Sequence, residues 1–198
     1  MESLNLQLFL LINAPAHPDP LTLALAKGLA EGVIWLVPLF LTVGWLWGTE
    51  QHRHSMLEAT AAGLGALALN QMIALVWQHP RPFMLGLGHT YLLHAPDSSF
   101  PSDHLTLLWS VAFSLCYHRS FRYLGMLLAL LGLPVAWSRV YLGVHFPLDM
   151  LGAVVTAEIS SWTLRRAAPL LLFYCYQPLQ TVYHNLTGPL IRRGWIAE

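Results

Sequence analysis

Charge is the scarcest feature of this chain. Only 10% of its 198 residues are charged, whereas 56% are hydrophobic and the mean hydropathy is +0.52. An average soluble domain is about one-quarter charged, so this composition excludes an ordinary soluble domain and predicts a protein that lies in a lipid bilayer. The formal net charge is zero, which gives no basis for nucleic-acid binding or for a polybasic attachment to a membrane surface.

Cysteine, repeats and targeting signals are equally scarce. The two cysteines, Cys116 and Cys175, fall in apolar stretches, so we expect small core residues rather than a disulfide pair. Residues 1–20 lack the basic start of a cleavable signal peptide and contain three prolines. No internal repeat or low-complexity linker divides the sequence. We therefore expect one integral-membrane domain over residues 1–198.

Long hydrophobic segments are abundant, and a helix needs about 20 apolar residues to cross a bilayer. Residues 3–13 are too short to span and are expected to lie in the interface. Residues 168–185, interrupted by Pro169 and Pro178, favour an interfacial or packed helix over a sixth span. The expected fold is an all-α polytopic membrane bundle of about five to six transmembrane helices with short interfacial helices. The candidate spans are residues 21–48, 56–78, 104–117, 123–138 and 147–164.

Basic residues outside the spans indicate the orientation of this bundle. With five spans they all fall on one side, which the positive-inside rule makes cytoplasmic. The loops that carry the polar motifs described next then fall together on the opposite face, which in a bacterium is the periplasmic face. The basic residues are Arg53, Arg119, Arg122, Arg165, Arg166, Arg192 and Arg193.

Three short polar motifs interrupt the apolar background. Arginines can grip phosphate oxygens in a planar fork, one histidine can attack phosphorus, and another can protonate a leaving oxygen. An aspartate four residues after a histidine can orient and polarise it. These residue types together predict metal-free phosphate ester chemistry. The motifs are Arg81-Pro82, Pro101-Ser102-Asp103-His104, and Ser138-Arg139 followed by His145 and Asp149.

The order and spacing of these motifs resemble the type 2 phosphatidic acid phosphatase superfamily, whose signature reads Lys-x6-Arg-Pro, Pro-Ser-Gly-His and Ser-Arg-x5-His-x3-Asp. The third part matches at every defined position. The second differs only in Asp103, which replaces Gly, and the first only in Ala74, which stands where Lys is expected. Longer strings over 79–83, 99–104, 137–145 and 189–195 are similar to the bacitracin-resistance type of undecaprenyl pyrophosphate phosphatases.

This resemblance implies that His145 is the nucleophile and forms a phosphohistidine with Asp149 as its partner. Without the resemblance, Asp149 could equally be a helix-start residue favoured by the dipole. Pro147 favours a helix start there, and Ser102 is expected to cap the helix that begins at the second motif. A helix start offers free N–H groups to a phosphate.

The remaining site residues are assigned from their chemistry. We expect His104 to be the general acid, and Arg81 and Arg139 to bind phosphate together with Ser102. Structural ion pairs are the alternative for the two arginines. Lys27 is the only lysine in the chain. It either replaces part of the positive charge missing at Ala74 and binds substrate, or snorkels beside Glu31.

No histidine and carboxylate cluster has the spacing of a metal site, and the resemblance likewise implies an enzyme without metal or other cofactor. It implies hydrolysis of undecaprenyl pyrophosphate to undecaprenyl phosphate and inorganic phosphate, which recycles the carrier of cell-wall precursors and confers bacitracin resistance. The expected partners are this polyprenyl pyrophosphate and membrane lipids. Three alternatives stay open: a phosphatase of phosphatidylglycerol phosphate or diacylglycerol pyrophosphate, a lipid A phosphotransferase, and a membrane transporter.

Overall fold

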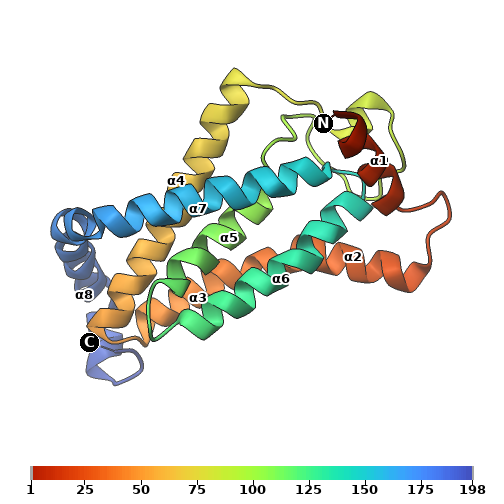
Figure 1. Cartoon of the computed structure of the whole chain (residues 1–198). Helices are drawn as coiled ribbons and strands as arrows, with labels where there is room; N and C mark the ends of the chain where they lie inside the picture. Colours follow the sequence, from red (N-terminus) through yellow and green to blue (C-terminus); the bar gives the residue numbers. More distant parts are fainter. Residues whose placement is uncertain (1, 198) are drawn as a thin grey trace.

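The computed structural model describes residues 2–197, which form helices and loops and contain no strand. The expected all-α fold is therefore confirmed. Helix α5 (Asp103–Cys116) lies at the centre, and it packs against α4 (Glu50–Val76), α6 (Arg122–Tyr141) and α7 (Pro147–Leu171) (Figure 1). Most residues of α5 are buried, including Leu105, Leu108 and Val111, so this helix forms the core around which the longer helices are arranged.

Three segments between residues 2 and 197 are long and apolar enough to cross a membrane: Pro20–Leu46, Glu50–Val76 and Arg122–Tyr141. The first consists of α2 (Pro20–Gly32), the short 3-10 helix η1 (Val33–Trp35) and α3 (Leu36–Leu46). The irregular turn has a chemical cause, because Pro38 has no N–H to donate to the carbonyl of Ile34. The expected span over residues 21–48 is therefore present as two helices in series.

Helix α4 begins six residues before the expected span. Its start is fixed by Thr49, whose hydroxyl accepts a hydrogen bond from the His52 N–H at 3.4 Å. The sequence places Arg53 in a loop between spans, and this prediction is wrong. Arg53 lies in α4 and is fully buried. Its charge is accommodated there because the guanidinium donates to the carbonyls of Trp45 and Ala197.

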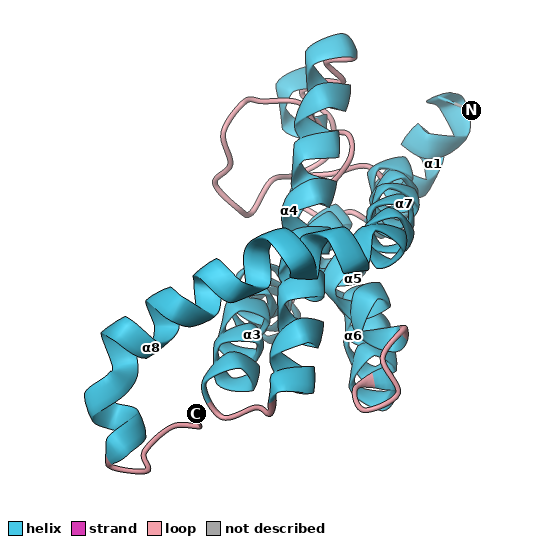
Figure 2. Cartoon of the chain, turned by 90° about the vertical axis from the view of Figure 1, so that its left-hand side faces the viewer, coloured by secondary structure: helices cyan, strands magenta, loops and turns pink. Residues whose placement is uncertain are grey.

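The C-terminal third is more continuous than the sequence suggests. Helix α7 runs seven residues past the expected span and continues through the π-helical segment η3 (Leu172–Tyr176) into α8 (Gln177–Arg192). Figure 2 shows α8 leading away from the bundle. With 16 residues, α8 is not among the three candidate spans.

The loops and helix ends at one end of the bundle carry all three polar motifs. The long connection from α4 to α5 contains the short helix η2 (Pro82–Leu85), and a tight turn joins α6 to α7. Helix α1 (Glu2–Ile12) lies against this same end, beside α6 and α7 (Figure 1). Because α5 and α7 begin there while α4 and α6 end there, residues distant in sequence converge.

Candidate active site

A histidine–aspartate pair forms the centre of the site. His145 Nδ1 lies 3.1 Å from Asp149 Oδ2, and both side chains are 1% exposed. Asp149 Oδ2 also accepts a hydrogen bond from the Phe146 backbone N–H at 2.8 Å. An ionised carboxylate only accepts, so Nδ1 carries the proton and the lone pair of the neutral ring is on Nε2. The expected His145–Asp149 interaction is thus present, and it leaves Nε2 as the ring nitrogen with the lone pair.

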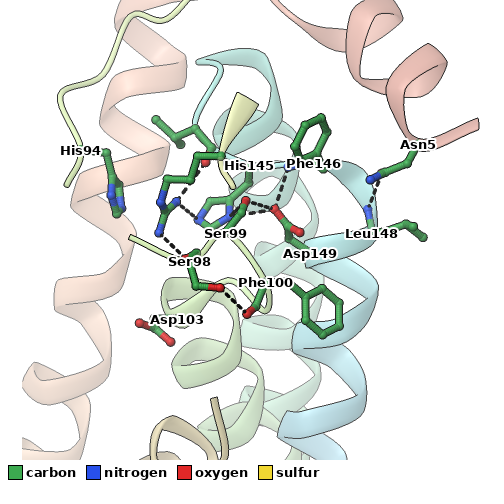
Figure 3. A network of polar contacts seen from close by, with 12 residues as sticks. Asn5, His94, Ser98, Ser99, Phe100, Asp103, His145, Phe146, Leu148 and Asp149 are labelled. Carbon is green, nitrogen blue, oxygen red and sulfur yellow. Dashed lines mark hydrogen bonds and ion pairs between the residues drawn. The ribbon is translucent and has the colours of Figure 1, made fainter. Parts of the chain in front are cut away.

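Ser99 completes this pair, although sequence reasoning gave it no role. Its side chain is fully buried, its hydroxyl donates to Asp149 Oδ2, and Ser99 Oγ lies 3.4 Å from His145 Nδ1. Figure 3 shows Ser99 beside both partners. The hydrogen bond from the Ser99 hydroxyl restricts rotation of the Asp149 carboxylate, and the carboxylate in turn fixes the plane of the His145 imidazole.

Arg81 approaches the same histidine from the opposite side. Its Nη1 lies 3.0 Å from His145 Nε2 and 2.9 Å from the Val144 carbonyl oxygen. Its Nε donates to Asp97 Oδ1 at 2.8 Å, and its Nη2 donates to the Ser98 carbonyl at 3.2 Å. Guanidinium nitrogens only donate, so His145 Nε2 accepts. Arg81 is therefore a fixed cation directly beside Nε2 of His145.

Arg139 and Ser102 supply buried donors without partners. Arg139, in the last turn of α6, is 1% exposed and donates from Nη1 to the Ala30 carbonyl at 3.4 Å. Among residues 2–197, its Nε and Nη2 have no hydrogen-bond partner, and neither does the hydroxyl of Ser102. An unmet buried donor costs about 1–3 kcal/mol, and more when it is charged. Such groups are stabilised when an anion binds them, so the arrangement fits a phosphate.

His104 lies in the first turn of α5, half-buried and within electrostatic reach of Arg81, Arg139 and His94. Burial lowers the pKa of His145 well below its usual range, and the charges of Arg139 and Arg81 lower it further. His145 is therefore neutral at neutral pH, as a nitrogen nucleophile must be.

The two departures from the family signature lie side by side. Ala74 and Asp103 border a small cavity of about 60 Å³ that Asn70 and Asp97 also line. Asp103 Oδ1 accepts a hydrogen bond from Asn70 Nδ2 at 2.8 Å, so this carboxylate is tied to α4. The unexpected aspartate of the second motif thus joins the α5 start to α4.

Lys27 is not brought to the other site residues. It lies on α2, where Ala26 and Ala30 are buried while Lys27 is exposed. Within residues 2–197, Lys27 makes no ion pair and no side-chain hydrogen bond, either with Glu31 or with any site residue. The orientation of α2 explains this, because its small residues face the bundle and its lysine faces outwards.

Asp97 and His94 are further site residues that the sequence did not reveal as such. Both lie on the loop before α5, and Asp97 binds Arg81. Their only signal is polarity in a loop next to the second motif. No helical or strand periodicity relates that loop to Arg81 or His145, so their proximity depends on the tertiary fold.

A helical bundle brings a histidine–aspartate pair and two buried arginines together at one end, an arrangement that suits the binding of a phosphate. Residues 55–173 match the PAP2 superfamily, and the chain belongs to that superfamily. This confirms the resemblance drawn from the motifs.

Two curated relatives extend the likeness beyond the motifs. The chain is 39% identical over 199 residues to the proposed undecaprenyl-diphosphatase YbjG of Escherichia coli K12, covering 100% of both chains. It is 33% identical over 168 residues to the undecaprenyl-diphosphatase BcrC of Bacillus subtilis 168, covering 85% of this chain and 86% of the relative. Among solved structures, LpxE of Aquifex aeolicus aligns with a TM-score of 0.63 at 25% identity, over 82% of this chain and 95% of LpxE.

Proposed function

We propose that this protein hydrolyses undecaprenyl pyrophosphate to undecaprenyl phosphate and inorganic phosphate. The names of the two curated relatives support this substrate. The observation that carries the chemistry is the set of unpartnered buried donors on Arg139 and Ser102, next to a histidine whose Nε2 lone pair is directed by Asp149. A phosphate is the ligand that would satisfy these donors and meet that nitrogen.

The reaction proceeds in two displacements. The terminal phosphate binds Arg139 and Ser102, and Arg81 exchanges its contact with Nε2 for a phosphate oxygen. His145 Nε2 then attacks the terminal phosphorus, the bond to the bridging oxygen breaks, and His104 donates a proton to that oxygen as it leaves. The arginines stabilise the charge on the oxygens of the transferred group.

Water completes the cycle. It attacks the phosphorus of the phosphohistidine, the N–P bond breaks, and the electron pair returns to Nε2. Inorganic phosphate leaves, and His104 takes up the proton that water releases. Asp149 keeps the proton on Nδ1 in place and stabilises the positive charge of the phosphorylated ring. The donors come from arginines, so the site performs this chemistry with its own side chains and without a metal ion.

The location that fits this role is the bacterial inner membrane, with the site on the periplasmic face. Apolar helices support a membrane protein, and Arg53, Arg122 and Arg165 lie towards the end of the bundle opposite Arg81 and His145. The positive-inside rule makes that opposite end cytoplasmic. In this place the enzyme would return the lipid carrier to cell-wall synthesis and raise tolerance to bacitracin.

Phosphate release by the purified protein tests the proposal. Undecaprenyl pyrophosphate is compared with phosphatidylglycerol phosphate, with diacylglycerol pyrophosphate, and with a lipid A acceptor for transferred phosphate. We expect the highest kcat/KM on undecaprenyl pyrophosphate, full activity in excess EDTA, and none in His145→Ala. A faster reaction with another lipid, or loss of activity on chelation that a divalent ion restores, would reject the proposal.

A further inference from the structure

A second histidine faces the catalytic one across the site. The ring centroids of His94 and His145 are 6.1 Å apart, at an interplanar angle of 78°. In Figure 3, His94 lies on one side of His145 and Asp149 lies on the other. His94 is therefore on the Nε2 side, where the substrate reacts, and not on the Nδ1 side that Asp149 and Ser99 occupy.

His94 is held and oriented by its own loop. Its Nδ1 donates to the Ala95 carbonyl at 3.2 Å and lies 3.7 Å from Asp97 Oδ1. Asp97 also binds Arg81 Nε. Since Nδ1 is engaged, Nε2 is the nitrogen that remains for a ligand. A carboxylate this close stabilises the imidazolium form, in which Nε2 carries a proton and donates.

The position of His94 differs from that of the buried site residues. The side chain of His94 is 20% exposed, whereas Arg139 and His145 are 1% exposed. His94 also borders an open cavity of about 480 Å³, which is lined by Phe83, Tyr91, Leu92 and Leu93. It thus stands at the boundary between the buried phosphate site and an open, largely apolar cavity.

A substrate with a single phosphate needs no further positive charge at this boundary. The attacked phosphoryl group already has Arg81, Arg139 and Ser102 for its oxygens and His104 for the leaving oxygen. The next group outwards differs among lipid substrates: it is an uncharged alkyl chain in a polyprenyl monophosphate and a second phosphate in a pyrophosphate. Only the second phosphate would bind a further cation.

We propose that His94, oriented by Asp97, binds the phosphate that remains on the lipid and so makes the enzyme selective for pyrophosphates over monophosphates. This inference rests on the proposed function and assigns a substrate feature to one residue outside the three motifs. The apolar cavity beside His94 would then take the first isoprene units.

The local electrostatics agree with this role. Burial lowers the pKa of His94, and the charges of Arg81 and Arg139 lower it further, against the opposing effect of Asp97. A bound pyrophosphate offsets the two arginine charges, so it raises the pKa of His94 and favours the protonated donor. His94 would acquire its charge when the anion arrives.

The test compares two substrates with one isoprenoid chain: farnesyl pyrophosphate and farnesyl monophosphate. Each kcat/KM of a variant is divided by the wild-type value for the same substrate, which removes the difference between the leaving groups. For His94→Gln we expect a loss of about tenfold to a hundredfold on the pyrophosphate, the range of a charge-assisted hydrogen bond. On the monophosphate we expect less than about twofold. His94→Arg restores a cation and should recover the preference for pyrophosphate.

His89→Ala is the matched control, because His89 is an exposed histidine on the same loop and should leave both values unchanged. Equal losses of His94→Gln on the two substrates, or no loss on either, would overturn the role of His94. Inactivity of the wild-type protein on polyprenyl pyrophosphates would instead refute the proposed function, and with it this inference.

Discussion

Ser99 illustrates how much a single hydroxyl can contribute to the site. It touches both His145 and Asp149, yet it need not contact the substrate. We expect Ser99→Ala to lower kcat by about tenfold to a hundredfold, because a lost hydrogen bond to a charged group is worth roughly 1.5–3 kcal/mol. KM should change little, since phosphate binding depends on other residues.

The neighbouring Ser98→Ala is the control for this prediction. The Ser98 hydroxyl donates only to backbone carbonyls, those of Trp77 and Phe100. Steady-state kinetics on both variants decide the matter. If KM of Ser99→Ala rises while kcat is unchanged, Ser99 contacts the substrate and does not act by orienting the histidine–aspartate pair.

Burial of His145 also makes stability depend on pH. Its folded pKa is lowered, while in the unfolded chain it titrates near its ordinary value of about 6.5. Below that pH the unfolded chain binds a proton at His145 that the folded protein does not, so the contribution of His145 to stability falls as the pH is lowered from 7 to 5. The limit for one group is about 1.4 kcal/mol per pH unit.

His145→Gln should reduce this acid sensitivity, because glutamine does not titrate. Thermal unfolding in detergent at pH 7 and pH 5 measures it for both proteins. A variant whose melting temperature drops between these pH values as far as that of the wild type would show that other groups cause the acid sensitivity.

The sequence predicted the site residues that belong to the three motifs. It missed the residues that only the tertiary fold brings close to His145. Arg81, Ser102, Arg139, His145 and Asp149 converge as expected because their motifs sit at helix ends. Ser99, Asp97 and His94 lie on an irregular loop whose path depends on long-range contacts. Lys27 was expected near the site from its depth along the chain, but depth does not specify which face of α2 a residue occupies.

At the scale of elements, α1 supports the turn that carries His145 and Asp149. Asn5 is buried, and its Oδ1 accepts a hydrogen bond from the Leu148 N–H at 3.0 Å. Phe9 packs on Phe146 with ring centroids 5.3 Å apart. Leu148 lies between His145 and Asp149 in sequence, so α1 satisfies a free N–H in the first turn of α7.

We therefore expect Asn5→Ala to lower kcat by about fivefold, which corresponds to the roughly 1 kcal/mol of a lost helix cap. Asn5→Asp keeps the acceptor and suits the positive helix end, so it should retain activity. Phosphate-release kinetics compare the two. If Asn5→Asp were as slow as Asn5→Ala, the hydrogen bond to α7 would not be what α1 contributes.

The contact between α5 and α6 depends on a glycine. A Cβ atom on Gly132 would collide with the indole of Trp109, whose Nε1 donates to the Ala129 carbonyl at 3.0 Å. We expect Gly132→Ala to destabilise the protein by about 1–3 kcal/mol. Gly28→Ala is the control, because among residues 2–197 its Cβ position has no atom within 4 Å apart from its chain neighbours and the nearby backbone of its own helix. A melting temperature for Gly132→Ala equal to that of Gly28→Ala would contradict this packing.

The helices themselves were largely predictable from hydrophobic segments, and their ends were not. The expected segments 104–117 and 123–138 coincide closely with α5 and α6. The start of α4 was missed because Glu50 and Arg53 suggest a loop. Partners from elsewhere accommodate the buried charge: Arg53 donates to the carbonyls of Trp45 and Ala197.

At the scale of the whole molecule, the proposed orientation makes a prediction about access. In a protein with Cys116 and Cys175 replaced by serine, Leu93→Cys should react with a membrane-impermeant maleimide in intact spheroplasts. Leu93 is fully exposed on the loop that bears His94. Tyr123→Cys, exposed at the other end of α6, should react only after permeabilisation. The reverse labelling pattern would show that the site faces the cytoplasm and would contradict the proposed orientation.

The contact between Arg81 and His145 Nε2 has a consequence for the resting protein. The Nε2 lone pair, which attacks phosphorus in the proposed mechanism, accepts a hydrogen bond from a guanidinium. Neutral electrophiles cannot draw that cation away, whereas a polyanionic headgroup can. If His145 is the nucleophile as proposed, this contact would shield its nitrogen from neutral electrophiles until the charge of a phosphate draws the guanidinium away.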